Sequence, residues 1–445
     1  MKTTEIELIS DGIAILILTI ILKSLQLFIG LDAQIESLPG KAKKAILMYV
    51  CGVIGLEKNA NSSKISELLG GISHDKLTRA LKGENVITGS LGLSLLNFCL
   101  SQTTGGWLII DDFLLAKRYS SKIEGVYNEY DHVTRQRVKG MRIVMILWTN
   151  GTIRMPVAWS IWHKEDKRFL GYGANGRPKY QKTGYCLLKV NGQAVSYRTK
   201  NQIALSLLND VMATGLNPKY ITFDNWYANQ RNLKRVHWLY LSFYSRLKEN
   251  RKVIYQGEKI SAKDLASRFP ISMFDHKHNA YIKALPVYLP GFGEIKLLLV
   301  RKDRHQEPGR TKFLFTNNLN ASAPEILLRY RSRWIIETAF RDLKQNLNFA
   351  SCQARGLLLQ ENHLALCLLA FVSLELQPGW NWMDYQARTI GEKKLLLSSL
   401  SFVNIRDQFF LLESQKSHAR LIPLASSDFA QVKDCVNRAF EILKN

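Results

Sequence analysis

Two short apolar runs, each ending at an aspartate, constrain the fold of this 445-residue chain most strongly. The first run, residues 107–110 (WLII), leads into Asp111 and Asp112, and the second, residues 220–223 (YITF), leads into Asp224. Runs of this length and apolar character predict strands that are buried in a sheet. Residues 202–214, between the two runs, have helical periodicity, and this alternation of strand and helix predicts a mixed α/β layer fold.

The aspartates at the ends of these runs are candidates for a metal site. Two carboxylates brought side by side stay ionised together only with a cation nearby, and Mg²⁺ prefers such oxygen ligands. For either aspartate alone, the start of a turn is the simpler reading. Asp111 and Asp112 are both available as the first carboxylate. We favour Asp111, because it follows the strand directly and alternation would turn Asp112 to the opposite face.

A third acid lies on a predicted helix that begins near Pro324. At about 100° per residue, one face of this helix gathers polar side chains within an arc of about 80°. These side chains are Tyr330, Arg333, Glu337, Arg341 and Lys344. The apolar residues fall on the other side and are predicted to pack on the core. A solvated face of mixed charge would also be polar, but it does not predict one acid flanked by cations and a tyrosine.

The spacing Tyr-x2-Arg-x3-Glu-x6-Lys on this helix resembles the signature of bacterial insertion-sequence transposases of the DDE class. Asp111 and Asp224 precede it in the order that this family uses. Tyr227, three residues after Asp224, is similar to the aromatic residue of the family's second-aspartate motif. The resemblance covers roughly residues 106–375. It departs from the family at Phe113, where a small hydroxyl residue is more usual.

The resemblance implies a ribonuclease-H-like catalytic core with a β-rich insertion. We expect the core at residues 106–235 and 318–375, the insertion at residues 236–317, and a helical tail at residues 376–445. The catalytic carboxylates would bind two Mg²⁺ ions, for which Mn²⁺ can substitute, to activate the attacking oxygen and stabilise the leaving oxygen. These carboxylates would be Asp111, Asp224 and Glu337.

The same resemblance implies that the basic face of the helix holds a DNA end near the scissile phosphate. Arginine binds phosphate with a planar fork of donors, and lysine supplies a point charge. The expected DNA-binding residues on this face are Tyr330, Arg333, Arg341 and Lys344. The net charge of +24 agrees with a polyanionic partner, of which nucleic acid is the usual one and an acidic membrane surface the competing one.

Residues 1–105 predict a helical N-terminal domain. Within it, residues 61–81 have helix-turn-helix spacing, and the second helix presents Lys76 and Arg79 outward for DNA contact. A plain helical hairpin is the alternative. The apolar run at residues 13–22 is shorter than the ~20 residues that a membrane span needs, so we expect a buried helix there rather than an anchor.

These features predict a DNA transposase that cuts insertion-sequence ends and transfers them into target DNA. Its expected partners are double-stranded DNA, as terminal inverted repeats and target, and a second copy of the chain in the DNA complex. The six cysteines are scattered without a C-x-x-C pair, which favours a reducing cytoplasm. The resemblance implies a bacterial cytoplasm, at the nucleoid, and we expect no membrane association. An inactive DNA-binding regulator or relic of the same family is the main alternative, and a membrane-associated basic protein is another.

Three tryptophans could stack on an unpaired base, namely Trp226, Trp334 and Trp380. Core packing is the role that we predict for each of them.

Overall fold

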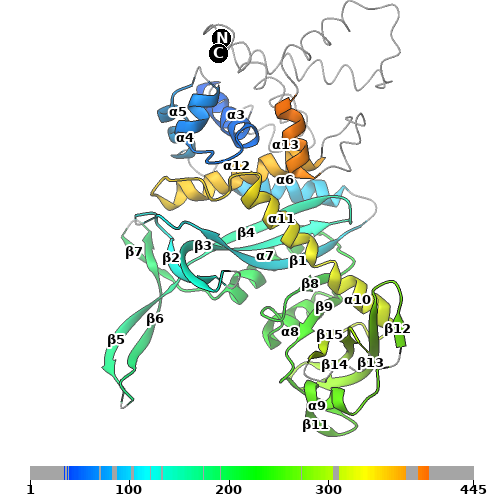
Figure 1. Ribbon diagram of the computed structural model, residues 1–445. Coiled ribbons are helices and arrows are strands. Elements are labelled where there is room, and N and C mark those ends of the chain that lie inside the picture. The colour runs from blue at the N-terminus through cyan, green and yellow to red at the C-terminus, as the bar shows by residue number, and fades with distance from the viewer. Residues whose placement is uncertain are drawn as a thin grey trace, which may run out of the picture. The chain divides into compact units, whose positions relative to one another are not determined.

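The computed structural model describes residues 35, 38, 40–69, 72–82, 88–101, 105–120, 122–131, 134–173, 175–190, 192–271, 273–303, 310–376 and 389–399 (Figure 1). The chain divides into two compact units, each assembled from separated stretches. The helical unit combines Met1–Phe98, Leu114–Met141 and Ala339–Asn445. The sheet unit combines Cys99–Phe113 and Arg142–Thr338. The apolar run at residues 13–22, residues 400–445 and Trp380 lie outside the described residues.

Helices build most of the described part of the helical unit. They are α3 (Gly40–Gly55), α4 (Ser62–Leu69), α5 (His74–Lys82), α6 (Thr88–Leu100), α11 (Trp334–Gln345), α12 (Leu357–Leu376) and α13 (Ile390–Ser399), of which α6 and α11 also extend into the sheet unit. Helix α12 is apolar around its whole circumference and packs against α3 and α5. Among the described residues, α12 alone is long and apolar enough to cross a membrane, and most of its surface is buried inside this unit. Helix α12 is therefore the core helix of this unit.

Helices α4 and α5 are the pair that the sequence predicted within residues 61–81. Their inward apolar residues Ile65, Leu69, Leu77 and Leu81 are buried, as the helical spacing requires. The helical unit also holds the first half of a hairpin, in which β2 (Tyr127–Asp131) pairs antiparallel with the start of β3.

A large mixed sheet forms the sheet unit. Its strands are β1 (Trp107–Ala116), β3 (Gln136–Thr149), β4 (Arg154–Trp162), β8 (Ile221–Phe223), β9 (Phe243–Leu247), β10 (Lys252–Tyr255), β11 (Glu258–Ser261), β12 (Met273–Asp275), β13 (Ala280–Leu289), β14 (Gly293–Arg301) and β15 (Lys312–Thr316). The order is β11-β10-β13-β14-β15-β9-β8-β1-β3, with β4 on β3 and β12 on β13. Strands β1, β8 and β9 run parallel to one another, and β9 pairs antiparallel with β15.

The helices of the sheet unit begin where the sequence supplies caps. They are α7 (Lys200–Ala213), α8 (Gln230–Trp238), α9 (Ala262–Ser267) and α10 (Ala323–Arg331). Thr199 and Gln202 form a capping box at α7, and Ser322 and Glu325 form one at α10. Each box satisfies backbone N–H groups that a helix start would otherwise leave unpaired.

A cluster of aromatic rings supports the strands of this sheet. Phe223 on β8, Phe243 on β9 and Phe315 on β15 are buried, and neighbouring rings lie 5.9 and 5.1 Å apart between centroids. The strand that precedes Asp224 is therefore fixed by the packed core as well as by its backbone pairing.

The structure corrects two expectations about element ends. Strand β1 does not stop at Asp111 but continues to Ala116, because its neighbour β3 is long enough to pair with it beyond the short strand β8. The helix from Pro324 is not continuous. It breaks at Ser332 and Arg333, where the Ser332 hydroxyl donates to the Arg329 carbonyl at 2.6 Å and three-residue turns replace the helical bonds.

Three further strands of the sheet unit form a separate small sheet. Strand β5 (Glu165–Tyr172) pairs antiparallel with β6 (Pro178–Val190), which pairs in turn with β7 (Gln193–Ser196). The sequence predicted no element between residues 162 and 202, so this sheet is a finding of the structure.

Candidate active site

The pairing of β1 with β8 places Asp111 and Asp224 side by side. The two strands are parallel, and their register aligns Ile110 with Phe223 as the last pair. An aspartate follows on each strand, so the two backbones lie at the same level, about 4.8 Å apart. Ile110 and Phe223 are buried beneath them.

Arg333 brings the third acid to the same place. Its Nη1 donates to Asp111 Oδ2 at 2.6 Å, and its Nη2 donates to the carboxylate of Glu337 one turn further along α11. The break between α10 and α11 points this guanidinium at β1, with the Arg333 N–H bonded to the Tyr330 carbonyl at 3.0 Å. One side chain thus binds both the first and the third predicted carboxylate.

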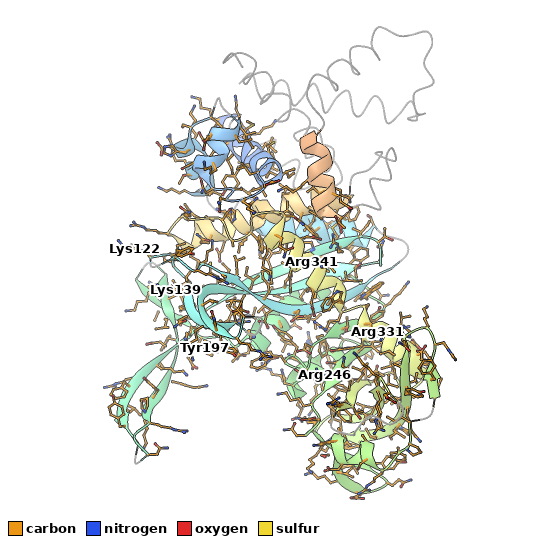
Figure 2. All side chains as sticks on the ribbon, viewed as in Figure 1. Lys122, Lys139, Tyr197, Arg246, Arg331 and Arg341 are labelled. Carbon is orange, nitrogen blue, oxygen red and sulfur yellow. The ribbon has the colours of Figure 1, made fainter. Side chains whose placement is uncertain are left out.

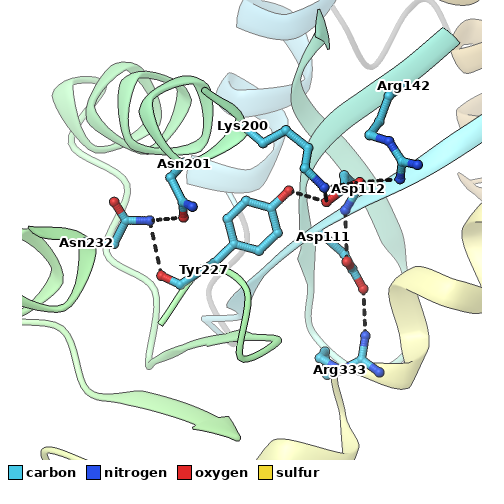
Figure 3. A network of polar contacts seen from close by, with 8 residues as sticks. All are labelled: Asp111, Asp112, Arg142, Lys200, Asn201, Tyr227, Asn232 and Arg333. Carbon is cyan, nitrogen blue, oxygen red and sulfur yellow. Dashed lines mark hydrogen bonds and ion pairs between the residues drawn. The ribbon is translucent and has the colours of Figure 1, made fainter. Parts of the chain in front are cut away.

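Asp112 faces a different set of partners (Figure 3). Its carboxylate accepts from Arg142 Nη1 at 2.9 Å, from Lys200 Nζ at 2.8 and 2.9 Å, and from the Tyr227 hydroxyl at 2.7 Å. Asn232 supports this arrangement by donating to the Tyr227 carbonyl at 3.1 Å. The acceptor positions of Asp112 are therefore filled by the protein, which suits a structural anchor.

The two neighbouring aspartates differ electrostatically. Burial raises the pKa of Asp111 to about 7; Arg333 opposes this shift, whereas the charges of Asp112 and Asp224 add to it. Burial would also raise the pKa of Asp112, but Lys200 and its other hydrogen-bond donors outweigh it and hold that pKa below its ordinary value. The charge of Asp111 is thus the poorly compensated one of the two.

The donor set fits a divalent cation in kind. Carboxylate oxygens are the ligands that Mg²⁺ prefers, and the uncompensated charge of Asp111 beside Asp224 is the condition that an added cation relieves. Within the part of the chain that the structure describes, no three acidic, histidine or cysteine side chains are grouped closely enough to hold an ion as they stand. Arg333 binds Asp111 and Glu337 instead, so an ion held by both requires this guanidinium to move.

The predicted DNA-binding residues divide between the two units. Tyr330 is half-buried in the sheet unit, with its ring centroid 6.0 Å from the Arg333 guanidinium carbon. Burial raises the pKa of its hydroxyl, an effect that Arg333 opposes and Asp224 reinforces. Arg341 and Lys344 are exposed on the part of α11 that belongs to the helical unit. Figure 2 labels Arg341.

Lys76 and Arg79 belong to the helical unit as well. Both side chains are exposed on α5, on the face opposite the buried Leu77 and Leu81, as the helical spacing predicted. Their contact with DNA stays a prediction.

Sequence reasoning missed the cations that fix Asp112. Arg142 lies on β3 and Lys200 opens α7, and neither position carries a local signal that pairs it with an aspartate far away in the sequence. The expectation that the tryptophans pack in the core is wrong for Trp226 and Trp334, whose exposed fractions are 54% and 60%. Lys200 Nζ lies 4.5 Å from the ring centroid of Trp226, so this ring lies beside the Asp112 network.

Two family profiles match the chain. Residues 35–268 match a DDE superfamily endonuclease, and residues 179–372 match a transposase DDE domain. The first match contains Asp111 and Asp224, and the second contains Asp224 and Glu337. No curated protein matches the chain.

Proposed function

Because the chain belongs to the DDE superfamily endonucleases, we propose that it is a DNA transposase that cuts the ends of an insertion sequence and joins them to target DNA. The observation that carries this proposal is the convergence of three acidic residues near the ends of two neighbouring strands. The β1–β8 register aligns Asp111 with Asp224, and Arg333 ties Asp111 to Glu337.

A ribonuclease-H-like core is the finer fold that we propose. It is supported by the strand order β4-β3-β1-β8-β9, in which β3 and β4 form an antiparallel hairpin and β1, β8 and β9 are parallel. Helix α7 leads into β8, α8 connects β8 to β9, and α10 and α11 follow the β-rich segment. We propose the core at residues 106–235 and 318–375 around the insertion at 236–317. Strand β9 pairs with β8, so we count Phe243–Leu247 with the core sheet although these residues follow position 235.

DDE transposases generally use divalent metal ions, and Asp111, Asp224 and Glu337 are the residues that we propose as ligands, with Mg²⁺ or Mn²⁺ bound. When bound, such ions supply the Lewis acidity that activates an attacking oxygen and stabilises the leaving one. Arg333 would leave the carboxylates as they bind the cation and turn to a phosphate oxygen, for which its guanidinium is suited. Tyr330, beside it, would orient the same phosphate.

Asp112 is a positioning residue in this proposal. Its bonds to Arg142, Lys200 and Tyr227 hold β1, β3, α7 and the segment after Asp224 in one arrangement. The two strand-borne carboxylates are thereby presented in a fixed geometry before DNA arrives, which is the preorganisation that catalysis requires.

The proposed partners are double-stranded DNA, bound as terminal inverted repeats and as target, and a second copy of the chain in that complex. Lys76 and Arg79 on α5, and Arg341 and Lys344 on α11, would add contacts to the phosphate backbone. We propose the bacterial cytoplasm, at the nucleoid, as its location.

The direct test is cleavage of DNA that carries the inverted repeats flanking the gene, with Mg²⁺ or Mn²⁺ present. Wild type should cut at the repeat end, and Asp224→Asn should bind the same DNA without cutting it. Asp210→Asn, on the exposed face of α7, is the matched control and should cut like wild type. Equal cutting by wild type and Asp224→Asn would refute the proposed site. Binding by wild type without cleavage under either metal would favour the inactive regulator.

A further inference from the structure

The paired strands β5 and β6 form a ribbon that the proposed chemistry does not use. Of its described residues from Lys167 to Lys182, all are exposed except Gly171 and Gly173, which are partly buried. Figure 1 shows this ribbon, and Figure 2 shows its side chains projecting from both faces. A two-stranded ribbon without a packed face has only marginal stability in water, so it gains stability from a partner.

The charge of the ribbon identifies the kind of partner. From Glu165 to Val190 it carries six cations, namely Lys167, Arg168, Arg177, Lys179, Lys182 and Lys189, against two acids, Glu165 and Asp166, at the start of β5. All six are exposed. Of these six cations, Lys182 alone has a carboxylate partner among the described residues, Glu165 at 3.5 Å. A surface of this kind attracts a polyanion, and it repels a second copy of itself.

Aromatic rings accompany these cations. Phe169 lies 5.7 Å from Tyr180 on the opposite strand and 5.3 Å from Tyr172, between ring centroids. The exposed fractions of the three residues are 49%, 56% and 73% respectively. Exposed rings between cations suit nucleic acid, because rings pack on sugars and bases while cations bind phosphates.

The two ends of the chain segment that forms the ribbon lie beside the candidate active site. Before β5, the chain leaves β4 at Trp162. Trp162 pairs across the strands with Arg142, whose guanidinium donates a hydrogen bond to Asp112. After β7, the chain enters α7 at Lys200, whose ammonium group also donates to Asp112. Both ends of this segment are therefore anchored next to the strand that carries Asp111.

We propose that the β5–β6 ribbon is a DNA-binding surface that holds the duplex flanking the bond to be cut. The inference rests on the proposed function for the choice of DNA. The major groove admits a two-stranded β-ribbon. The eight residues of β5 span about 26 Å at ~3.3 Å per residue, enough for up to about eight base pairs at ~3.4 Å.

The test compares two triple variants of the full chain with the same change in net charge. The ribbon variant is Lys167→Gln, Arg168→Gln and Lys179→Gln. The control variant is Lys234→Gln, Lys259→Gln and Lys263→Gln, all exposed in the sheet unit. Binding of repeat-end DNA is measured by fluorescence anisotropy in EDTA over a range of salt concentrations. The slope of log K against log salt should flatten by about 2–3 in the ribbon variant, at ~0.9 per lost phosphate contact, and by less than 1 in the control.

A second variant tests the rings. Tyr172→Ser with Tyr180→Ser should shorten the nuclease footprint by up to about eight base pairs on one side while protection at the cut end persists. Far-UV circular dichroism and thermal unfolding verify that each variant is folded. An unchanged slope and footprint would overturn the inference, as would a loss of dimer mass with DNA affinity intact. If wild type itself fails to bind repeat-end DNA, the proposed function fails first and the ribbon inference with it.

Discussion

Replacing either of the two adjacent aspartates by asparagine makes the same chemical change in two different surroundings. At Asp112 the change removes the charge that three buried or half-buried donors share, on Arg142, Lys200 and Tyr227. The cations of Arg142 and Lys200, with side-chain exposures of 13% and 16%, would lose their ion pairs with this carboxylate. At Asp111 the change removes a charge that burial already disfavours, and Arg333 keeps its bond to Glu337.

The magnitudes follow from these surroundings. Breaking a buried ion pair by removing one partner costs about 3–5 kcal/mol, because the other charge stays buried and unpaired. Asp112→Asn should therefore lower the free energy of unfolding by roughly 4 kcal/mol, which corresponds to a fall in Tm of roughly 10 °C for a unit of this size. Asp111→Asn should leave it unchanged or raise it, because relief of the desolvated charge outweighs the lost bond to Arg333, as the raised pKa of Asp111 indicates.

Urea unfolding at pH 8, followed by tryptophan fluorescence, measures both variants, and cleavage of repeat-end DNA is assayed below the unfolding transition. We expect Asp111→Asn to be stable and inactive, and Asp112→Asn to be unstable with residual cleavage at low temperature. A stable, inactive Asp112→Asn together with an active Asp111→Asn would refute the assignment of their roles. Equal destabilisation by the two variants would refute the electrostatic reasoning.

Three more outcomes are expected. Burial lowers the pKa of His363 to about 3, below the 6.5 of the unfolded chain, so its contribution to stability is full above pH 6.5 and falls as the pH drops. In equilibrium unfolding, the free energy of wild type should fall by about 2 kcal/mol relative to that of His363→Gln between pH 7.5 and 5. Tyr227→Phe removes one donor to Asp112 without changing charge and should cost about 1–2 kcal/mol in urea unfolding, less than Asp112→Asn. Trp226→Ala should alter thermal stability by less than about 0.5 kcal/mol, whereas Trp148→Ala, in the core, should cost about 3–5 kcal/mol.

The sequence predicted the strands and helices that follow simple periodicity. The apolar runs before Asp111 and Asp224 are strands, and residues 202–214 are largely α7. The end of β1 at Ala116 could not be predicted from the sequence. Two adjacent acids look like the end of a strand unless it is known that β3 pairs with the residues that follow them. Local pattern thus located the elements but not the extent of their pairing.

The candidate site shows the same division. The spacing on the predicted helix singled out Arg333 and Glu337, yet the break at Ser332 and the contact between Arg333 and Asp111 depend on tertiary packing. The β5–β6 ribbon did carry a readable signal, since Asn175-Gly176 is a turn signature between two runs that contain aromatic residues. Its many lysines and glycines obscured the alternation expected of a half-buried strand.

The alignment of Ile110 with Phe223 has a consequence for how this chain tolerates change. Peptide groups, whose hydrogen bonds are indifferent to side-chain identity, set the distance between the two aspartate backbones. Substitutions around them can therefore accumulate without altering that spacing. Inserting or deleting a single residue in either strand would instead turn one acid to the far face of the sheet, so the lengths of these two segments should be far less variable than their composition.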